Sequence, residues 1–233
     1  MARPILDQEL QTIADKVTLM SEAVEGAIGE AVKALKERDQ ALATKVIDDG
    51  EAIDDMEDEI KDICFKFLAT QNPLAGDLRY VISIMKIIRD LERIGDHSED
   101  ISKYAIRFAG ENFIKELIDI PRMADLSTRM VKNSIDAFVH RDLRLARRVW
   151  KTDEEVDEMF RNLYDELLEM AAADSRNTKQ CIMFLFVAAH LERIADYATN
   201  ICEEAVFVQE GDYRMEADNN IASDSDAVML NNI

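Results

Sequence analysis

Apolar residues recur along the chain at alternating intervals of three and four. The first stretch, residues 4–37, is typical, with Leu10, Ile13, Val17 and Met20 in this spacing. Such a pattern lines one side of an α-helix and indicates helices that pack against one another in a bundle. The same pattern predicts further helices over residues 39–69, 77–109, 121–140, 142–173 and 178–209.

The predicted helices are separated by residues that favour turns or helix ends. Asp39 is a residue type that caps helix N-termini, and Pro73 and Gly76 separate the second helix from the third. The longest break is 110–120, which we expect to be a hinge between two halves. After residue 211 the pattern stops, and the Asn, Asp and Ser content of residues 212–233 predicts a loose acidic tail.

The two halves of the chain resemble each other. Residues 91–94 read Leu-Glu-Arg-Ile and return at 191–194, each time with an aspartate two residues later. Arg38-Asp39 is likewise matched by Arg141-Asp142. An internal repeat of this length is a whole structural unit. We therefore predict an all-α tandem repeat of two long antiparallel three-helix bundles with pseudo-twofold symmetry, over 1–109 and 121–211.

The charge of the chain excludes some classes of partner. Among 233 residues, 48 Asp and Glu outnumber 28 Lys and Arg, which gives a formal net charge of −20. This excess repels nucleic acids and anionic lipids, and it favours cations and basic protein surfaces. We expect no binding to nucleic acid.

The cysteines and the apolar stretches bear on location. Cys64, Cys181 and Cys202 all fall within helical patterns, where a cysteine acts as a small apolar side chain. The longest apolar run, residues 181–189, is too short to span a bilayer. We therefore expect a cytoplasmic protein in a reducing compartment.

Carboxylates follow the apolar stripes of two helices in each half. Glu92, Asp96 and Asp100 recur at four-residue steps, which places them on one face of a helix. The same pattern returns at Glu192 and Asp196. The preceding helix of each half adds further acids, which are Glu51, Asp54 and Asp55 in the first half and Asp153 and Asp157 in the second.

Two interpretations of these acidic rows stay open. Like charges one turn apart destabilise a helix by roughly 0.2–0.5 kcal/mol per pair, so a bound cation would explain why they recur. Oxygen ligands suit Mg²⁺, Ca²⁺, Mn²⁺ and iron. Alternatively, Arg89, Arg93 and Arg193 lie three residues from an acid and would form ordinary surface salt bridges.

The sequence offers little sign of catalysis. It contains no Glu-x-x-His, which counts against a ferritin-like di-iron oxidase, and no metalloprotease or phosphate-loop motif. His97, His140 and His190 are interpreted as solvated or core residues. The apolar segment around Phe184 and Phe186 fits core packing, or a surface for a second subunit.

The chain resembles the PhoU family, the cytoplasmic regulators of bacterial phosphate uptake. The resemblance rests on the tandem repeat, on Asp77-Leu78-Arg79, and on the segments 91–96 and 191–196. It implies paired bundles that dimerise and act without catalysis. It also implies repression of the phosphate-starvation response through contacts with a phosphate ABC transporter and its sensor histidine kinase, so that any membrane association runs through these partners.

The resemblance further implies metal sites. The ions would be iron, manganese, magnesium or zinc, in some members as multinuclear iron clusters. By position, the ligands are Asp54, Glu92 and Asp96 in one half and Asp153, Asp157, Glu192 and Asp196 in the other.

The sequence departs from the family pattern at Gly50, where the second half has Asp153. The first site would then use Glu51 and Asp55, or be weaker. Asn200 in place of Asp100 has the opposite effect. The leading hypothesis is a metal-binding adaptor, and the alternatives are a carboxylate-bridged iron protein (an oxidase or a metal store) and a helical interaction module without a ligand.

Overall fold

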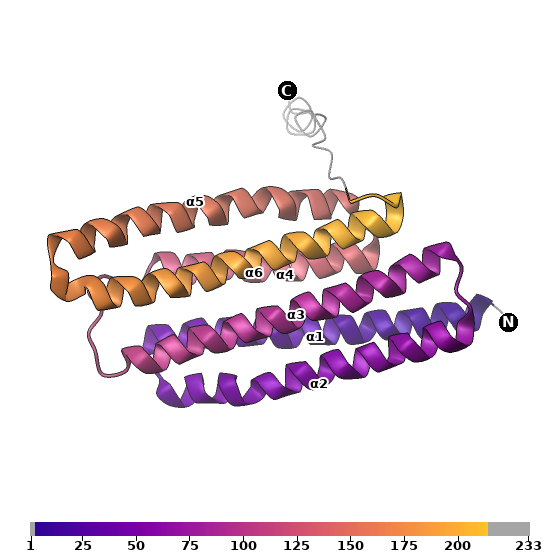
Figure 1. The fold of residues 1–233 in the computed structure, drawn as a ribbon, viewed down its shortest axis with the longest axis horizontal. Coiled ribbons are helices and arrows are strands. Elements are labelled where there is room, and N and C mark those ends of the chain that lie inside the picture. The colour runs from indigo at the N-terminus through magenta and orange to yellow at the C-terminus, as the bar shows by residue number, and fades with distance from the viewer. Residues whose placement is uncertain (1–2, 214–233) are drawn as a thin grey trace, which may run out of the picture.

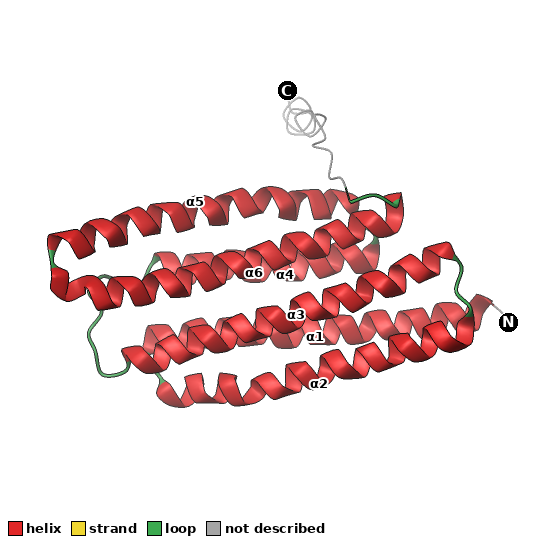
Figure 2. Cartoon of the chain, in the orientation of Figure 1, coloured by secondary structure: helices red, strands yellow, loops and turns green. Residues whose placement is uncertain are grey.

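The computed structural model describes residues 3–213, and this part of the chain is built from six long helices (Figures 1 and 2). The first and last residues of each helix lie within two residues of the predicted ends. Residues 214–233 of the expected acidic tail lie outside the described range. The helices are α1 (Arg3–Glu37), α2 (Gln40–Gln71), α3 (Ala75–Phe108), α4 (Asp119–His140), α5 (Leu143–Ala173) and α6 (Thr178–Glu210), with a short 3₁₀ turn, η1 (Ser175–Asn177), before α6.

The helices form two three-helix bundles that lie side by side, as predicted (Figure 1). Helices α1, α2 and α3 make one bundle, and α4, α5 and α6 make the other. The bundles meet where α3 packs on α6 and α1 packs on α4. None of these helices, within residues 3–213, is apolar over a length that would cross a bilayer.

Helices α3 and α6 run antiparallel at the junction between the bundles. Lys86 on α3 contacts Glu204 on α6, and Tyr104 on α3 stacks on Phe186 of α6. The repeat offset of 100 residues exchanges these two contacts, as the predicted pseudo-twofold symmetry requires. Positions related by this offset therefore occupy equivalent places at the two ends of the junction.

The first turn of each bundle has the same backbone design. Arg38 and Arg141 adopt left-handed conformations, with φ of 57° and 55°. The next residue, Asp39 or Asp142, donates its backbone N–H to a carbonyl five residues back, which closes the preceding helix in a Schellman motif. The same aspartate side chain then accepts from the N–H three residues on and caps the next helix, as predicted for Asp39.

The apolar half of the repeated Leu-Glu-Arg-Ile motif belongs to the core. Leu91, Ile94, Leu191 and Ile194 are fully buried. Because the intervening Glu-Arg pair then faces away from the core, the motif fixes where the carboxylates emerge. The three cysteines are buried and reduced, in agreement with their interpretation as apolar side chains.

The connection from α3 to α4 is fastened to the second bundle. Phe113 packs on Phe108 and Phe184, and the Gln180 amide accepts from the Ile114 N–H. Lys115 forms an ion pair with Glu166 on α5. These contacts tie the expected hinge segment to α5 and α6.

At one helix contact the two repeats have side chains of different size that together fill the same space. Gly95 of α3 lies against Ile53 of α2, and a Cβ at Gly95 would meet two Ile53 carbons at 3.3 Å. The equivalent pair in the second repeat is Ala195 and Val156. The methyl group missing at Gly95 is thus offset by the larger Ile53.

This fit predicts strong coupling between Gly95→Ala and Ile53→Val. Alanine gains about 1 kcal/mol of helix propensity over glycine, but at position 95 it crowds Ile53. The double variant has the residue pair of the second repeat. Its free energy of unfolding should be about 1 kcal/mol higher than the sum of the two single-variant effects predicts. Urea unfolding measures this. Gly26→Ala, where no neighbour lies within 4 Å, is the uncrowded control, and strictly additive effects would contradict the prediction.

Candidate metal centres

The first acidic cluster lies between α2 and α3. Asp54 on α2 faces Asp96 on α3, and Glu92 and Glu99 extend the group along α3. Burial raises the pKa of Asp54, Glu92 and Glu99, and repulsion by Asp96 adds to each shift. The helices therefore hold carboxylates close together against their own repulsion.

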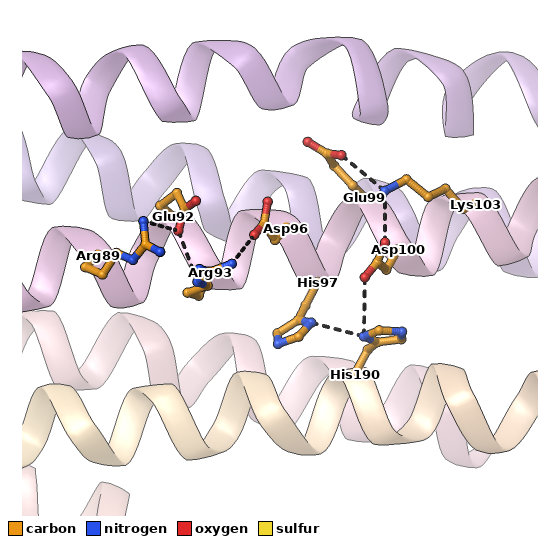
Figure 3. A network of polar contacts seen from close by, with 9 residues as sticks. All are labelled: Arg89, Glu92, Arg93, Asp96, His97, Glu99, Asp100, Lys103 and His190. Atoms are coloured by element: carbon orange, nitrogen blue, oxygen red, sulfur yellow. Dashed lines mark hydrogen bonds and ion pairs between the residues drawn. The ribbon is translucent and has the colours of Figure 1, made fainter.

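Arginines neutralise part of this first cluster, as the salt-bridge interpretation expects (Figure 3). Arg93 donates to Asp96 at 3.0 Å, and Arg89 and Arg93 each lie 3.6 Å from Glu92 Oε2. That oxygen is nevertheless buried and has no hydrogen-bond partner among residues 3–213. The arginines thus leave at least one ligand atom available.

The second cluster lies between α5 and α6 and is made of Asp153, Asp157, Glu192 and Asp196. Burial raises the pKa of Asp153 to about 6, with added repulsion from Asp196 and Asp157. Burial and neighbouring carboxylates also raise the pKa of Glu192 and Asp196. Over the described part of the chain, no Lys or Arg comes within ion-pair distance of these four carboxylates, in contrast with the Arg93–Asp96 pair.

The two clusters differ by a reciprocal exchange across the helix interface. Glu99 Oε1 fills the space that a Cβ at Gly50 would occupy. In the second repeat the equivalent positions are Thr199 and Asp153, so the carboxylate comes from the other helix. The structure thus places Glu99 where the sequence analysis looked to Glu51 and Asp55. The complementary residues at these paired positions were the signal available in the sequence.

The remaining predicted ligands lie apart from these clusters. Glu51 and Asp55 are exposed on α2, and so is Asp54; Asp54 is assigned to the cluster because repulsion by Asp96 adds to its raised pKa. Asp100 projects from α3 toward α6 instead of α2 (Figure 3). Of the predicted acids, three in the first repeat and all four in the second therefore repel one another electrostatically, and metal binding by them stays a prediction.

Asp100 belongs to a third group, which the sequence analysis did not identify. His97 Nδ1 lies 3.0 Å from His190 Nδ1, and His190 Nδ1 lies 4.0 Å from Asp100 Oδ2. Among residues 3–213, these three side chains are grouped closely enough to hold a metal ion. His97 and Asp100 have helical i, i+3 spacing, but the sequence gives no sign that His190 lies opposite them.

Fold and clusters together define the class: a duplicated all-α protein of paired three-helix bundles, with a carboxylate cluster between the second and third helices of each. The sequence profile of the PhoU domain matches residues 17–105 and 120–205, one match in each bundle. The chain belongs to the PhoU family.

Related proteins match over nearly their whole length. The PhoU homologue of Clostridium acetobutylicum is 35% identical over 212 residues, which cover 91% of this chain and 97% of that protein. The Aquifex aeolicus homologue is 38% identical, covering 89% and 94%. Both are described as phosphate-specific transport system accessory proteins.

Solved structures agree with the fold. PhoU of Pseudomonas aeruginosa superposes with a TM-score of 0.84 at 32% identity, over 88% of this chain and 99% of that chain. The phosphate transport system regulatory protein PhoU of Streptococcus pneumoniae has the same TM-score at 29% identity, over 91% and 100%. The family is one of regulatory accessory proteins and not of enzymes.

Proposed function

We propose that this chain is a non-enzymatic regulator of phosphate uptake and of the phosphate-starvation response. It acts in the cytoplasm as a metal-binding adaptor between a phosphate transporter and its sensor histidine kinase. Support comes from the family membership and from the descriptions of its relatives. The observation that carries the metal-binding part is the second acidic cluster, four carboxylates whose charges repel one another and that form no ion pair with a Lys or Arg within residues 3–213.

Each cluster has the chemistry of a site for hard cations. The first would use Asp54, Glu92, Asp96 and Glu99, and the second Asp153, Asp157, Glu192 and Asp196. All donors are carboxylate oxygens, which suits Mg²⁺, Mn²⁺ and iron. Glu92 Oε2 is buried, and within residues 3–213 it has two arginines at 3.6 Å but no hydrogen bond, so a bound ion would supply the close partner that it lacks.

A cation in each cluster would serve the adaptor role through charge and shape. It would cancel the repulsion between the carboxylates of α2 and α3 and between those of α5 and α6, and so hold these faces in one geometry. With a net charge of −20, the surface suits a basic partner surface. A homodimer is part of the same proposal, and sedimentation measures it directly.

The regulatory role is tested in a strain that lacks the gene. In phosphate-rich medium this strain should express a phosphate-starvation reporter at least tenfold above wild type, and the intact gene should restore repression. A strain without the gene that still represses the reporter would rule out the role.

The metal role is tested separately in the same strain. A gene carrying Asp96→Asn, Asp153→Asn and Asp157→Asn should fail to restore repression. The control, Glu158→Gln with Asp165→Asn, removes two charges from exposed positions of α5, against three in the cluster variant, and should restore repression. Full repression by the cluster variant would mean that regulation does not require metal at these sites.

Glu99 is expected to be a ligand of the first cluster. Glu99→Gln should weaken Mn²⁺ binding there by about tenfold, which corresponds to about 1.4 kcal/mol. A separate double variant with the residues of the second repeat, Gly50→Asp with Glu99→Thr, should bind Mn²⁺ as the wild type does. Calorimetric titration measures both, with exposed Glu51→Gln as the control. Equal affinities in Glu99→Gln and the wild type would exclude this ligand.

A further inference from the structure

We propose that His97, His190 and Asp100 bind one divalent transition-metal ion of the zinc type, which bridges α3 and α6 and so joins the two repeats. This centre is separate from the two acidic clusters, because Asp100 and His97 project from the side of α3 that faces α6 (Figure 3). It does not depend on the proposed function.

The distances between donor atoms fit such an ion. Two nitrogens bound to tetrahedral zinc at about 2.0–2.1 Å are about 3.3 Å apart. The two Nδ1 atoms share a hydrogen bond at 3.0 Å, and a bound ion would take the place of the shared proton with little movement of either ring. Asp100 Oδ2, at 4.0 Å from His190 Nδ1, needs only a small rotation of a partly exposed side chain to complete a three-ligand set.

The burial of His97 supports a ligand role. Its side chain is only 9% exposed, and its Nε2 has no hydrogen-bond partner among residues 3–213. The ring is therefore held in place with one polar contact, through Nδ1. That one contact joins the ring to His190, the second proposed ligand.

The charges around the group select the kind of ion. Asp96 and Asp100 attract a cation, whereas Arg93, Lys103 and Arg193 oppose it, and all of them line the same groove of about 380 Å³. A hard cation such as Mg²⁺ gains little from two imidazoles in that setting. Zinc and the other late first-row divalent metal ions bind imidazole nitrogens more strongly.

Lys103 completes the arrangement as a supporting residue. It donates to Asp100 Oδ1 at 2.9 Å, while Oδ2 of the same carboxylate faces His190 (Figure 3). Such partners orient a ligating carboxylate. The groove leaves room for a water as the fourth ligand.

The group is not a by-product of the duplication. The equivalent positions at the other end of the α3–α6 junction, at an offset of 100 residues, are Tyr197, Asn200 and Asp90. That trio lacks imidazole ligands. The two acidic clusters exist in both repeats, but this group exists at one end only, so the expected stoichiometry is one ion per chain.

The test is a zinc titration of the full chain by calorimetry, in millimolar Mg²⁺ that occupies the oxygen sites. The wild type should bind one Zn²⁺ tightly, and His190→Ala should weaken this about 100-fold. His140→Ala, which alters an exposed histidine on α4, should bind as the wild type does. X-ray absorption of the zinc-loaded wild type should show two imidazole ligands.

Further variants keep the test decisive if one of them folds poorly. Asp100→Asn should also weaken zinc binding, and circular dichroism checks that each variant is helical. Asp153→Asn with Asp157→Asn should leave zinc binding unchanged, which separates this centre from the acidic clusters. Absence of stoichiometric Zn²⁺ binding in the wild type, or unchanged affinity in folded His190→Ala, would overturn the proposal.

Discussion

Replacing Phe108 with alanine is expected to lower the free energy of unfolding by about 3–5 kcal/mol. Phe108 ends α3 and is fully buried. Its ring stacks on Phe184 of α6 at 4.6 Å and meets the edge of Phe113, in the connection between the bundles, at 5.4 Å. The substitution leaves a cavity where three segments meet, and few neighbours can move to fill it.

Phe186→Ala is the matched control for this prediction. Phe186 lies on α6 two residues after Phe184, but it is 49% exposed and stacks only at the surface, on Tyr104. Its removal should cost less than about 1 kcal/mol. Chemical denaturation followed by circular dichroism compares the two variants. Similar small losses for both would mean that the aromatic contacts at Phe108 do not hold the junction together.

The sequence predicted the helices and the two bundles well because one periodic signal determines both. A helix must bury its apolar stripe, and the repeated Leu-Glu-Arg-Ile motif marks where that stripe meets a carboxylate row. The sequence alone therefore assigns Leu91 and Leu191 to the core and Glu92 and Glu192 to its edge. Local spacing sufficed, since each assignment concerns residues on a single helix.

Side-chain contacts that depend on how two helices are aligned could not be predicted from the sequence. Asp100 shares a row with Glu92 and Asp96, yet a helix turns 100° per residue, and over eight residues the row drifts toward a different neighbour. The register of α3 against α6 then decides that Asp100 meets His190. Glu99 was missed for a related reason, because its long side chain reaches the space above Gly50 on another helix.

The two acidic clusters are therefore not equivalent, although they arose from one unit. Arg93 is bonded to Asp96 in the first cluster, whereas the exposed Arg193 forms no such pair with the second cluster within residues 3–213. A cation entering the first cluster competes with a guanidinium that is already present. The second cluster has the larger uncompensated charge, and we expect it to bind metal more tightly.

Substitution of Asp153 and Asp157 by asparagine should therefore reverse its effect on stability when metal is added. With a chelator present, the double variant should be more stable than the wild type by about 1 kcal/mol, because partly buried like charges are removed. In Mn²⁺ at 100 to 1,000 times its dissociation constant, the wild type gains about 2.7–4.1 kcal/mol at this cluster, and the variant gains little of that. The order of the two unfolding temperatures should then be opposite.

Thermal unfolding of the wild type and the double variant, each with chelator and with Mn²⁺, measures this reversal of the unfolding temperatures. Glu158→Gln with Asp165→Asn lowers the negative charge by the same amount at exposed positions of α5 and should show no reversal. General charge repulsion predicts that both variants are stabilised alike under all conditions. If the aspartates have a structural role instead, the cluster variant should be less stable than the wild type even with chelator. Only metal binding at the second cluster predicts that the stability difference between the cluster variant and the wild type changes sign. Equal stabilisation of the wild type and the cluster variant by Mn²⁺ would exclude such binding.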